Sequence, residues 1–150
     1  MREAIRLSRQ KMHANCGGPF GAIIVQKNKL IARGWNRVTS ANDPTAHAEI
    51  SAIREACKKL KTFRLDDCEI YVSCEPCPMC LAAIYWARLR KIFYANTLND
   101  AAKIGFDDGS IYRELSRSIS RRKIPMKQLL RDEAIKVFAE WNKKPDKTVY

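Results

Sequence analysis

Long hydrophobic runs are missing from the 150-residue sequence, and so is the pattern of a secretory signal peptide. No apolar stretch approaches the roughly 18 residues that a membrane-spanning helix needs. The first residues show a charged, helical spacing without the apolar centre of a signal peptide. We therefore expect a cytoplasmic protein, in which disulfides are disfavoured and clustered cysteines indicate a metal site or a catalytic site.

Acidic residues are in short supply. Sixteen Asp and Glu residues stand against 28 Lys and Arg residues, so the formal net charge is +12. A surplus of this size favours an anionic partner, nucleic acid above all, although charged runs are more often a solvated surface. The composition, 46% hydrophobic and 29% charged, is that of a globular protein, and 150 residues is a length typical of one domain with its own core.

Histidine is rare too, with two residues in the chain, and one of them belongs to a metal-binding pattern. His47 stands in the stretch Thr-Ala-His-Ala-Glu, and Cys77 and Cys80 stand in Glu-Pro-Cys-Pro-Met-Cys. One histidine and two cysteines suit zinc, and three protein ligands rather than four leave a position open for water. The combination H-x-E…P-C-x-x-C is typical of zinc-dependent nucleobase deaminases. The sequence therefore predicts a catalytic zinc site with these three ligands.

Glu49 follows His47 by two residues and is not a ligand in this interpretation. Zinc lowers the pKa of a bound water towards 7, and the Glu49 carboxylate would take the water proton and hand it to the substrate. The alternative is a structural zinc site closed by Cys74, in the run Cys74-x-x-Cys77-x-x-Cys80. Because Cys74 ends an apparent strand, where a buried thiol is ordinary, we favour the catalytic site.

Hydrophobic periodicity predicts alternating strands and helices. The order β-β-α-β-α-β favours an α/β sheet covered by helices, with parallel pairing and right-handed crossovers in its β-α-β stretches. Both metal-binding motifs fall at helix starts, outside the ends of strands, where such sheets bind ligands. Residues 124–130 could add an edge strand, since Pro125 tolerates only an edge or a first position. We expect helices at 2–15, 45–59 (with Thr45 as N-cap), 77–87 and 131–141, and strands at 21–25, 30–35, 68–73 and 91–95.

The chain resembles the cytidine deaminase superfamily and, within it, the bacterial zinc-dependent guanine deaminases. The zinc motif is common to the superfamily, whereas three other features are similar to the guanine-specific members: the Gly-Gly-Pro-Phe turn (17–20), the Gly-Phe-Asp-Asp stretch (105–108) and the closing tyrosine. The resemblance implies a three-layer α-β-α fold with a mixed five-stranded sheet, and one catalytic domain over residues 1–150. It also implies hydrolytic deamination of guanine to xanthine and ammonia in purine metabolism, with one zinc ion per subunit.

The resemblance further implies which residues meet the substrate. Asp108 would accept an N–H beside the reacting carbon and help the amine to leave, as a second catalytic residue next to Glu49. Asn36 would bind the polar edge of the purine. The implied substrate-binding set is Phe20, Asn36, Ala48, Trp86, Asp108 and Tyr150, in which Phe20 and Trp86 flank the flat ring and Tyr150 closes over the site.

The family also suggests a homodimer in which residues 116–150 are exchanged, so that Tyr150 could serve the partner's site. The basic run at 117–123 and the region 131–147 depart from the family pattern. Simpler roles are open for the substrate-binding residues. Phe20 and Trp86 could be core aromatics, Asn36 could be a turn residue, and Asp107 and Asp108 could cap a helix, with Asp107 the better candidate.

Three other functions compete with guanine deamination. A transfer-RNA adenosine deaminase shares the zinc motif, and a charge of +12 would favour it through phosphate contacts. Guanosine or cytosine deamination would use the same chemistry. A non-enzymatic, zinc-stabilised module that binds nucleic acid would explain the charge but would leave Glu49 without a role.

Overall fold

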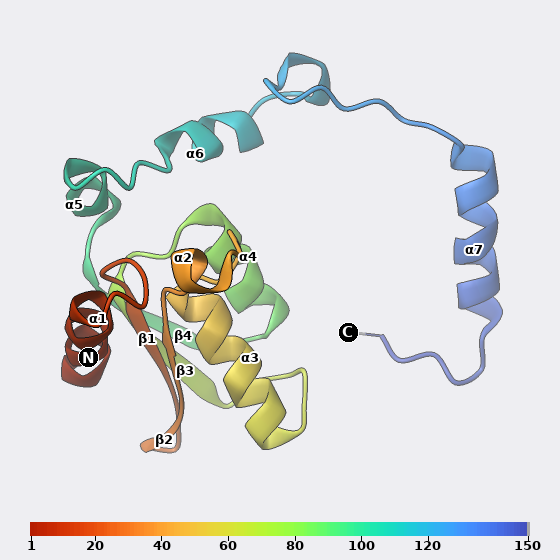
Figure 1. Cartoon of the computed structure of the whole chain (residues 1–150). Coiled ribbons are helices and arrows are strands. Elements are labelled where there is room, and N and C mark those ends of the chain that lie inside the picture. Colours follow the sequence, from red (N-terminus) through yellow and green to blue (C-terminus); the bar gives the residue numbers. More distant parts are fainter. Residues whose placement is uncertain (150) are drawn as a thin grey trace. The chain divides into compact units, whose positions relative to one another are not determined.

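The computed structural model describes residues 1–149 and leaves Tyr150 outside the described residues. The chain divides into two compact units, one from Met1 to Gly109 and one that begins at Ser110. The strands and the first helices lie where the hydrophobic periodicity predicts them (Figure 1). The elements of the first unit are α1 (Arg2–His13), β1 (Gly21–Gln26), β2 (Lys29–Trp35), α2 (Val38–Ala41), α3 (Ala48–Leu60), β3 (Cys68–Cys74), α4 (Pro78–Trp86), β4 (Lys91–Asn96) and α5 (Leu98–Lys103).

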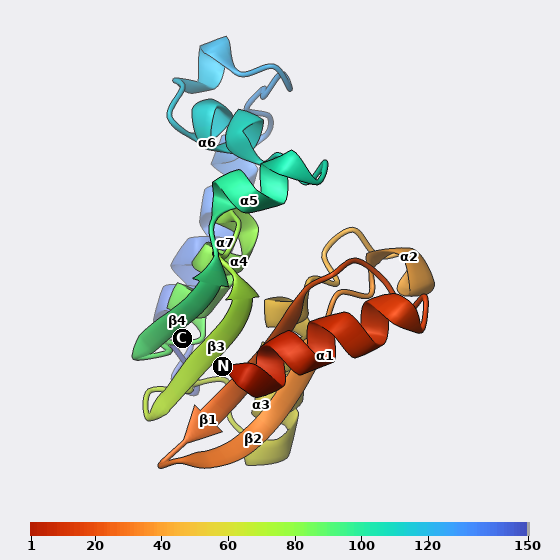
Figure 2. The ribbon, with the colours of Figure 1, turned by 90° about the vertical axis from the view of Figure 1, so that its left-hand side faces the viewer.

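A mixed sheet with the strand order β2-β1-β3-β4 forms the centre of the first unit (Figure 2). β1 pairs antiparallel with β2 and with β3, whereas β3 and β4 pair in parallel. The prediction of five strands is wrong for the described residues, because the sheet there has four. Residues 124–130 are exposed and form no strand, and Pro125 within them lacks the N–H that a strand would donate.

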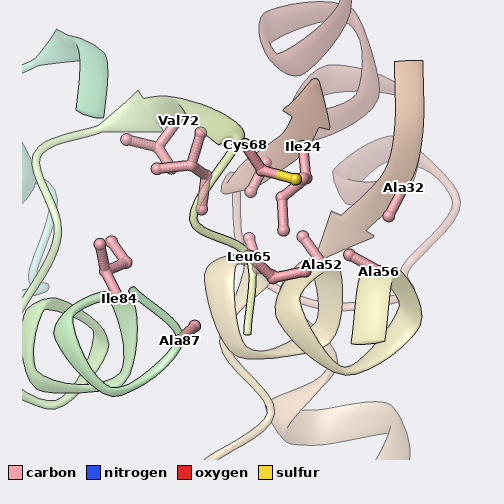
Figure 3. Close-up of a cluster of buried hydrophobic side chains, with 12 residues drawn as sticks. Ile24, Ala32, Ala52, Ala56, Leu65, Cys68, Val72, Ile84 and Ala87 are labelled. Atoms are coloured by element: carbon pink, nitrogen blue, oxygen red, sulfur yellow. The ribbon is translucent and has the colours of Figure 1, made fainter. Parts of the chain in front are cut away.

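Helices cover both faces of the sheet, as predicted. α1 packs on one face, against β1 and β3, and α3 and α4 lie on the other face (Figures 1 and 2). The alternation along β3 explains how the core forms, because every second side chain of this strand is buried towards α3 and α4. The buried cluster contains Ala22, Ile24, Ala32, Ala48, Ala52, Ala56, Leu65, Cys68, Ile70, Val72, Ile84 and Ala87 (Figure 3).

α3 crosses β2 so closely that no side chain fits at Gly34. A Cβ atom on Gly34 would lie 2.1 Å from the carbonyl oxygen of Ala48 and 2.4 Å from the amide nitrogen of Ala52. Both alanines are buried, and their small side chains allow the helix backbone to approach the sheet. The close crossing fixes the first turn of α3 and, with it, the residue that precedes the helix, His47.

The second unit has helices but no buried side chain among its residues up to 149. It contains most of α6 (Gly109–Leu115), the short 3-10 helix η1 (Ile119–Arg121) and α7 (Arg131–Lys143), which confirms the predicted helix at 131–141. Its exposed apolar residues include Leu115, Ile124, Leu129, Leu130, Val137, Phe138 and Trp141. In neither unit is a described helix long and apolar enough to cross a membrane.

Candidate active site

The predicted metal ligands lie at the starts of two helices. His47 is the N-cap of α3 and Cys77 is the N-cap of α4, both with extended backbone conformations. Cys80 follows in the first turn of α4. The prediction that Thr45 caps α3 is wrong, because its N–H and its hydroxyl both donate to Oδ1 of Asp43, 2.8 and 2.7 Å away, in the turn before the helix.

The three ligand atoms are spaced as a tetrahedral zinc ion requires. Nδ1 of His47 lies 3.5 Å from Sγ of Cys77 and 3.4 Å from Sγ of Cys80, and all three atoms lie within 4.8 Å of one another. With Zn–S and Zn–N bonds of about 2.3 and 2.0 Å, tetrahedral angles separate nitrogen from sulfur by about 3.5 Å. The donor set and its spacing therefore fit zinc.

Hydrogen bonds prepare one of the sulfurs for a metal. Cys80 and His47 both hydrogen-bond to Cys77, and these bonds lower the pKa of Cys77 to about 4. The hydrogen bond to Cys77, together with burial, raises the pKa of Cys80. Because the thiolate is the form of cysteine that binds metals, Cys77 is ready to bind, and Cys80 must release a proton when zinc enters.

Cys74 is not part of this group. The candidate metal cluster found in residues 1–149 consists of His47, Cys77 and Cys80. The Cys74 thiol instead donates to the carbonyl oxygen of Thr97 at 3.5 Å, and burial raises the pKa of Cys74 to about 11. The alternative of a structural site closed by four protein ligands is therefore not supported, and three ligands would leave a coordination position for a water molecule.

Glu49 is buried close to the metal group. It is the second residue of α3, and 8% of its surface is exposed. Burial raises the pKa of Glu49, and the negative charge of Cys77 adds to the increase. A carboxyl group with a raised pKa can accept and return a proton near neutral pH. This environment suits the predicted proton shuttle.

The two neighbouring aspartates have different environments. Oδ1 of Asp107 accepts a hydrogen bond at 2.9 Å from the N–H of Gly109, the first residue of α6. Asp108 is half-buried, and burial together with the charge of Cys77 raises its pKa. It also interacts electrostatically with His47. Asp108 is thus partly buried within electrostatic range of the metal group, whereas Asp107 is exposed.

Asn36 and Phe20 are joined at the end of the β1–β2 pair. The Asn36 N–H donates to the Phe20 carbonyl at 3.1 Å. Oδ1 of the buried Asn36 side chain accepts from the N–H groups of Gly18 and Val38, each at 3.2 Å. Because both partners are donors, the carboxamide is oriented with its oxygen towards the backbone. The NH₂ group of Asn36 is then the part that can address a ligand.

The remaining predicted residues are less closely tied to the ligands. Ala48 is the first residue of α3, and its side chain belongs to the hydrophobic core. Trp86 is the last residue of α4, nine residues after Cys77 and about 13 Å from it along the helix axis, and its ring is exposed. The assignment of Tyr150 falls outside the described residues. The substrate roles of these three residues remain predictions.

Two contacts at the site were not predicted from the sequence. The Phe106 ring packs edge-on against Phe20, with ring centroids 4.9 Å apart and an interplanar angle of 88°. The Glu75 carboxylate accepts from the N–H of Leu98 at 3.2 Å, which links the loop before Cys77 to the start of α5. Both residues lie in stretches that the sequence singles out, but the partners are distant in sequence, so only the fold reveals them.

Comparison with known proteins decides the family. The cytidine and deoxycytidylate deaminase zinc-binding region matches residues 1–96, which include the whole sheet and all three metal ligands. The chain belongs to the cytidine and deoxycytidylate deaminase family. Zinc is therefore the cofactor of this deaminase, and His47, Cys77 and Cys80 are the group that could hold it.

Individual deaminases match nearly the whole chain. Guanine deaminase from Bacillus subtilis (strain 168) is 49% identical over 150 residues, which cover 100% of this deaminase and 96% of the relative. The X-ray structure of that enzyme has a TM-score of 0.97 at 50% identity, over 99% of this chain and 95% of the other. A guanine deaminase from Nitrosomonas europaea has a TM-score of 0.67 at 34% identity, over 95% and 82%.

A transfer-RNA deaminase is also similar, over less of the chain. The tRNA-specific adenosine deaminase of Buchnera aphidicola subsp. Schizaphis graminum is 36% identical over 126 residues, which cover 83% of this chain and 80% of the relative. The similarity to the Bacillus subtilis guanine deaminase is both higher, at 49% against 36% identity, and longer, at 150 against 126 residues.

Proposed function

We propose that this deaminase hydrolyses guanine to xanthine and ammonia, in purine breakdown or salvage. The observation that carries the proposal is the 49% identity to a guanine deaminase along the whole chain. The zinc signature alone fits deaminases of several nucleobases. The higher identity along all 150 residues is what favours guanine, because the match to a tRNA-specific adenosine deaminase is 36% identical over 126 residues.

Glu49 performs the proton transfers in the proposed mechanism. His47, Cys77 and Cys80 would hold the zinc ion, which would make a bound water acidic enough to react at neutral pH. The buried Glu49 carboxylate accepts the water proton and donates it to the ring nitrogen beside C2 as oxygen bonds to C2. The C2–N bond to the amino group then breaks, and ammonia leaves with the second proton. Guanine and one water thus become xanthine and ammonia.

Asn36 and Asp108 offer complementary groups to the base. The oriented Asn36 side chain presents NH₂, a donor for a ring nitrogen or the carbonyl oxygen of guanine. Asp108 presents acceptors, and guanine has two adjacent donors at N1 and at the 2-amino group. Phe20 and Trp86 are assigned to the faces of the base, and Ala48, the first residue of α3, is assigned to the substrate-binding set.

A homodimer is the proposed functional state, with one catalytic domain per chain and residues 116–150 exchanged between subunits. The absence of buried side chains in residues 110–149, despite many apolar ones, supports a partner for this segment. Tyr150 is then assigned to the site of the partner. Six free cysteines support a reducing compartment, and we assign the enzyme to the cytoplasm.

One assay tests the function. Ammonia release is measured for guanine, guanosine, cytosine, adenine and transfer RNA, with the zinc content of the same sample determined in parallel. We expect guanine to be the preferred substrate. The net charge of +12 and the 36% identity to a tRNA deaminase make transfer RNA the alternative. If only transfer RNA releases ammonia, the proposed guanine deamination is wrong and the enzyme edits RNA.

A further inference from the structure

Phe106 is the large side chain of the Gly-Phe-Asp-Asp stretch that the proposed function leaves without a role. It lies at the surface, with 46% of its area exposed, next to Ile104, which is 60% exposed. Its ring is nevertheless placed by a specific contact, edge-on to Phe20 at 4.9 Å. Edge-to-face pairs attract because the positive edge of one ring meets the negative face of the other. Phe106 is therefore held against Phe20, which itself packs on the hydrophobic core.

Gly18 also contributes to the position of the Phe106 ring. A Cβ atom on Gly18 would lie 3.4 Å from Cζ of Phe106 and 3.4 Å from Cδ2 and Cε2 of Phe20. The bare backbone of Gly18 thus lies beside both rings, and a branched side chain there would have to push one of them away. We call the contact between Gly18, Phe20 and Phe106 the Phe106 clasp.

Phe106, one member of the clasp, lies two residues before Asp108 in the sequence. At Gly105 the chain has φ +91°, with nothing within 4 Å of an ideal Cβ, so the segment turns through open space there. The Phe106 N–H then donates to the carbonyl of Ala101 at 3.0 Å. Asp108 is half-buried although Asp107 before it is exposed. The ring of Phe106 is thus the side chain that joins this exposed segment to the end of β1, where Phe20 lies.

We propose that Phe106 is a positioning residue that holds Asp108 in place at the metal group. The carboxylate of Asp108 acts on the substrate, and Phe106 acts through it. The role in catalysis rests on the proposed function, but the clasp itself can be tested without any turnover. A misplacement of about 1 Å in a substrate-positioning group can cost about 100-fold in rate.

Kinetics give the first test. In the zinc-loaded enzyme, Phe106→Ala is expected to lower kcat/KM for guanine by about 10- to 100-fold, with unchanged zinc content and melting temperature. Phe106→Tyr keeps the edge-to-face contact and should restore most of the activity, and Phe106→Leu should fall between. Ile104→Ala, a matched apolar truncation in the same exposed segment, should change kcat/KM by no more than about twofold.

A double-mutant cycle separates positioning from direct substrate contact. If Phe106 acts through Asp108, Phe106→Ala should cost no more than about twofold in an Asp108→Asn background. Gly18→Val should mimic Phe106→Ala, and the two changes should not add. An undiminished loss in the Asp108→Asn background would overturn the proposal, because Phe106 would then act on the substrate by another route.

Amide hydrogen exchange tests the clasp independently of activity. Residues 106–109 should exchange faster in Phe106→Ala than in the wild-type protein, and at the wild-type rate in Ile104→Ala. Equal exchange rates at residues 106–109 in all three proteins would show that the Phe106 ring does not stabilise this segment. That conclusion would not depend on the substrate. A different outcome is possible: Phe106→Ala exchanges faster than the wild-type protein, but the wild-type protein releases no ammonia from guanine. That result would refute the proposed function and leave the Phe106 clasp supported.

Discussion

The two units of the chain use apolar residues in opposite ways. In the first unit, side chains such as Ile24 and Ile70 are fully buried between the sheet and its helices. In the second unit, Phe138 on α7 is 72% exposed although its helix has regular hydrophobic spacing. A helix with an uncovered apolar face generally needs a partner surface. The first unit therefore carries its own core and the metal group, whereas the second unit has no buried core among its described residues.

The largest expected effect comes from disabling the first unit chemically while leaving both units folded. Glu49→Gln keeps the size of the buried side chain but removes its ability to exchange a proton. We expect kcat to fall by at least about 1000-fold, with zinc content, melting temperature and oligomeric state unchanged. Burial already raises the pKa of Glu49, so a neutral side chain suits the site. Turnover near the wild-type level would exclude Glu49 as the proton shuttle, and Glu55→Gln, on the exposed side of α3, is the control.

A pair of truncations compares the two cores directly. Ile70→Ala removes a fully buried side chain of β3 and should lower the free energy of unfolding by about 2–5 kcal/mol. Phe138→Ala should change it by less than about 0.5 kcal/mol in dilute protein if α7 has no partner. At concentrations that favour the dimer, the same change should weaken association. Sedimentation and chemical denaturation at two protein concentrations measure both effects, and a concentration-independent loss for Phe138→Ala would show that the second unit has its own core.

The alternating strands and the zinc ligands could be predicted from the sequence because both depend on local spacing. The motif around His47 and the cysteines of α4 place three ligands at two helix starts, whatever the packing details. The prediction of a fifth strand at 124–130 was wrong because the local sequence does not determine whether a strand edge is available for pairing. The Thr45 cap failed because a competing acceptor, Asp43, captures its hydroxyl.

The contacts that orient the substrate-side residues could not be predicted, because they join residues that lie far apart in sequence. The amides of Gly18 and Val38 converge on Asn36 only once β1 and β2 have paired. The ring contact of Phe106 spans 86 residues of chain from Phe20. The sequence also left open whether Cys74 is a fourth zinc ligand. In the structure the Cys74 thiol donates to Thr97 instead.

Asn36 should have an intermediate effect, which also separates folding from recognition. Asn36→Asp retains an acceptor for the Gly18 and Val38 amides but removes the NH₂ donor. We therefore expect a wild-type melting temperature and a kcat/KM lower by about tenfold. Asn36→Ala leaves both amides without their acceptor and should lower stability as well as activity. Asn142→Ala, on α7 of the second unit, is the control and should leave the KM for guanine unchanged. If Asn36→Asp has the wild-type KM, Asn36 does not bind the substrate.

The smallest effect is expected from a surface ion pair of the first unit, between Glu3 and two arginines. Glu3 of α1 accepts hydrogen bonds from Arg6 and from Arg33 of β2, and these bonds lower its pKa from 4.5 to about 2. Because the ionised form favours the folded state, its contribution is present above about pH 4.5 and is lost as the pH falls from 4.5 to 2. Glu3→Gln should thus lower the melting temperature slightly at pH 7 and less at pH 3. Added salt should reduce the difference at pH 7. Glu140→Gln on α7 is the control, and equal changes in melting temperature for the two variants would mean that Glu3 does not help to attach α1 to the sheet.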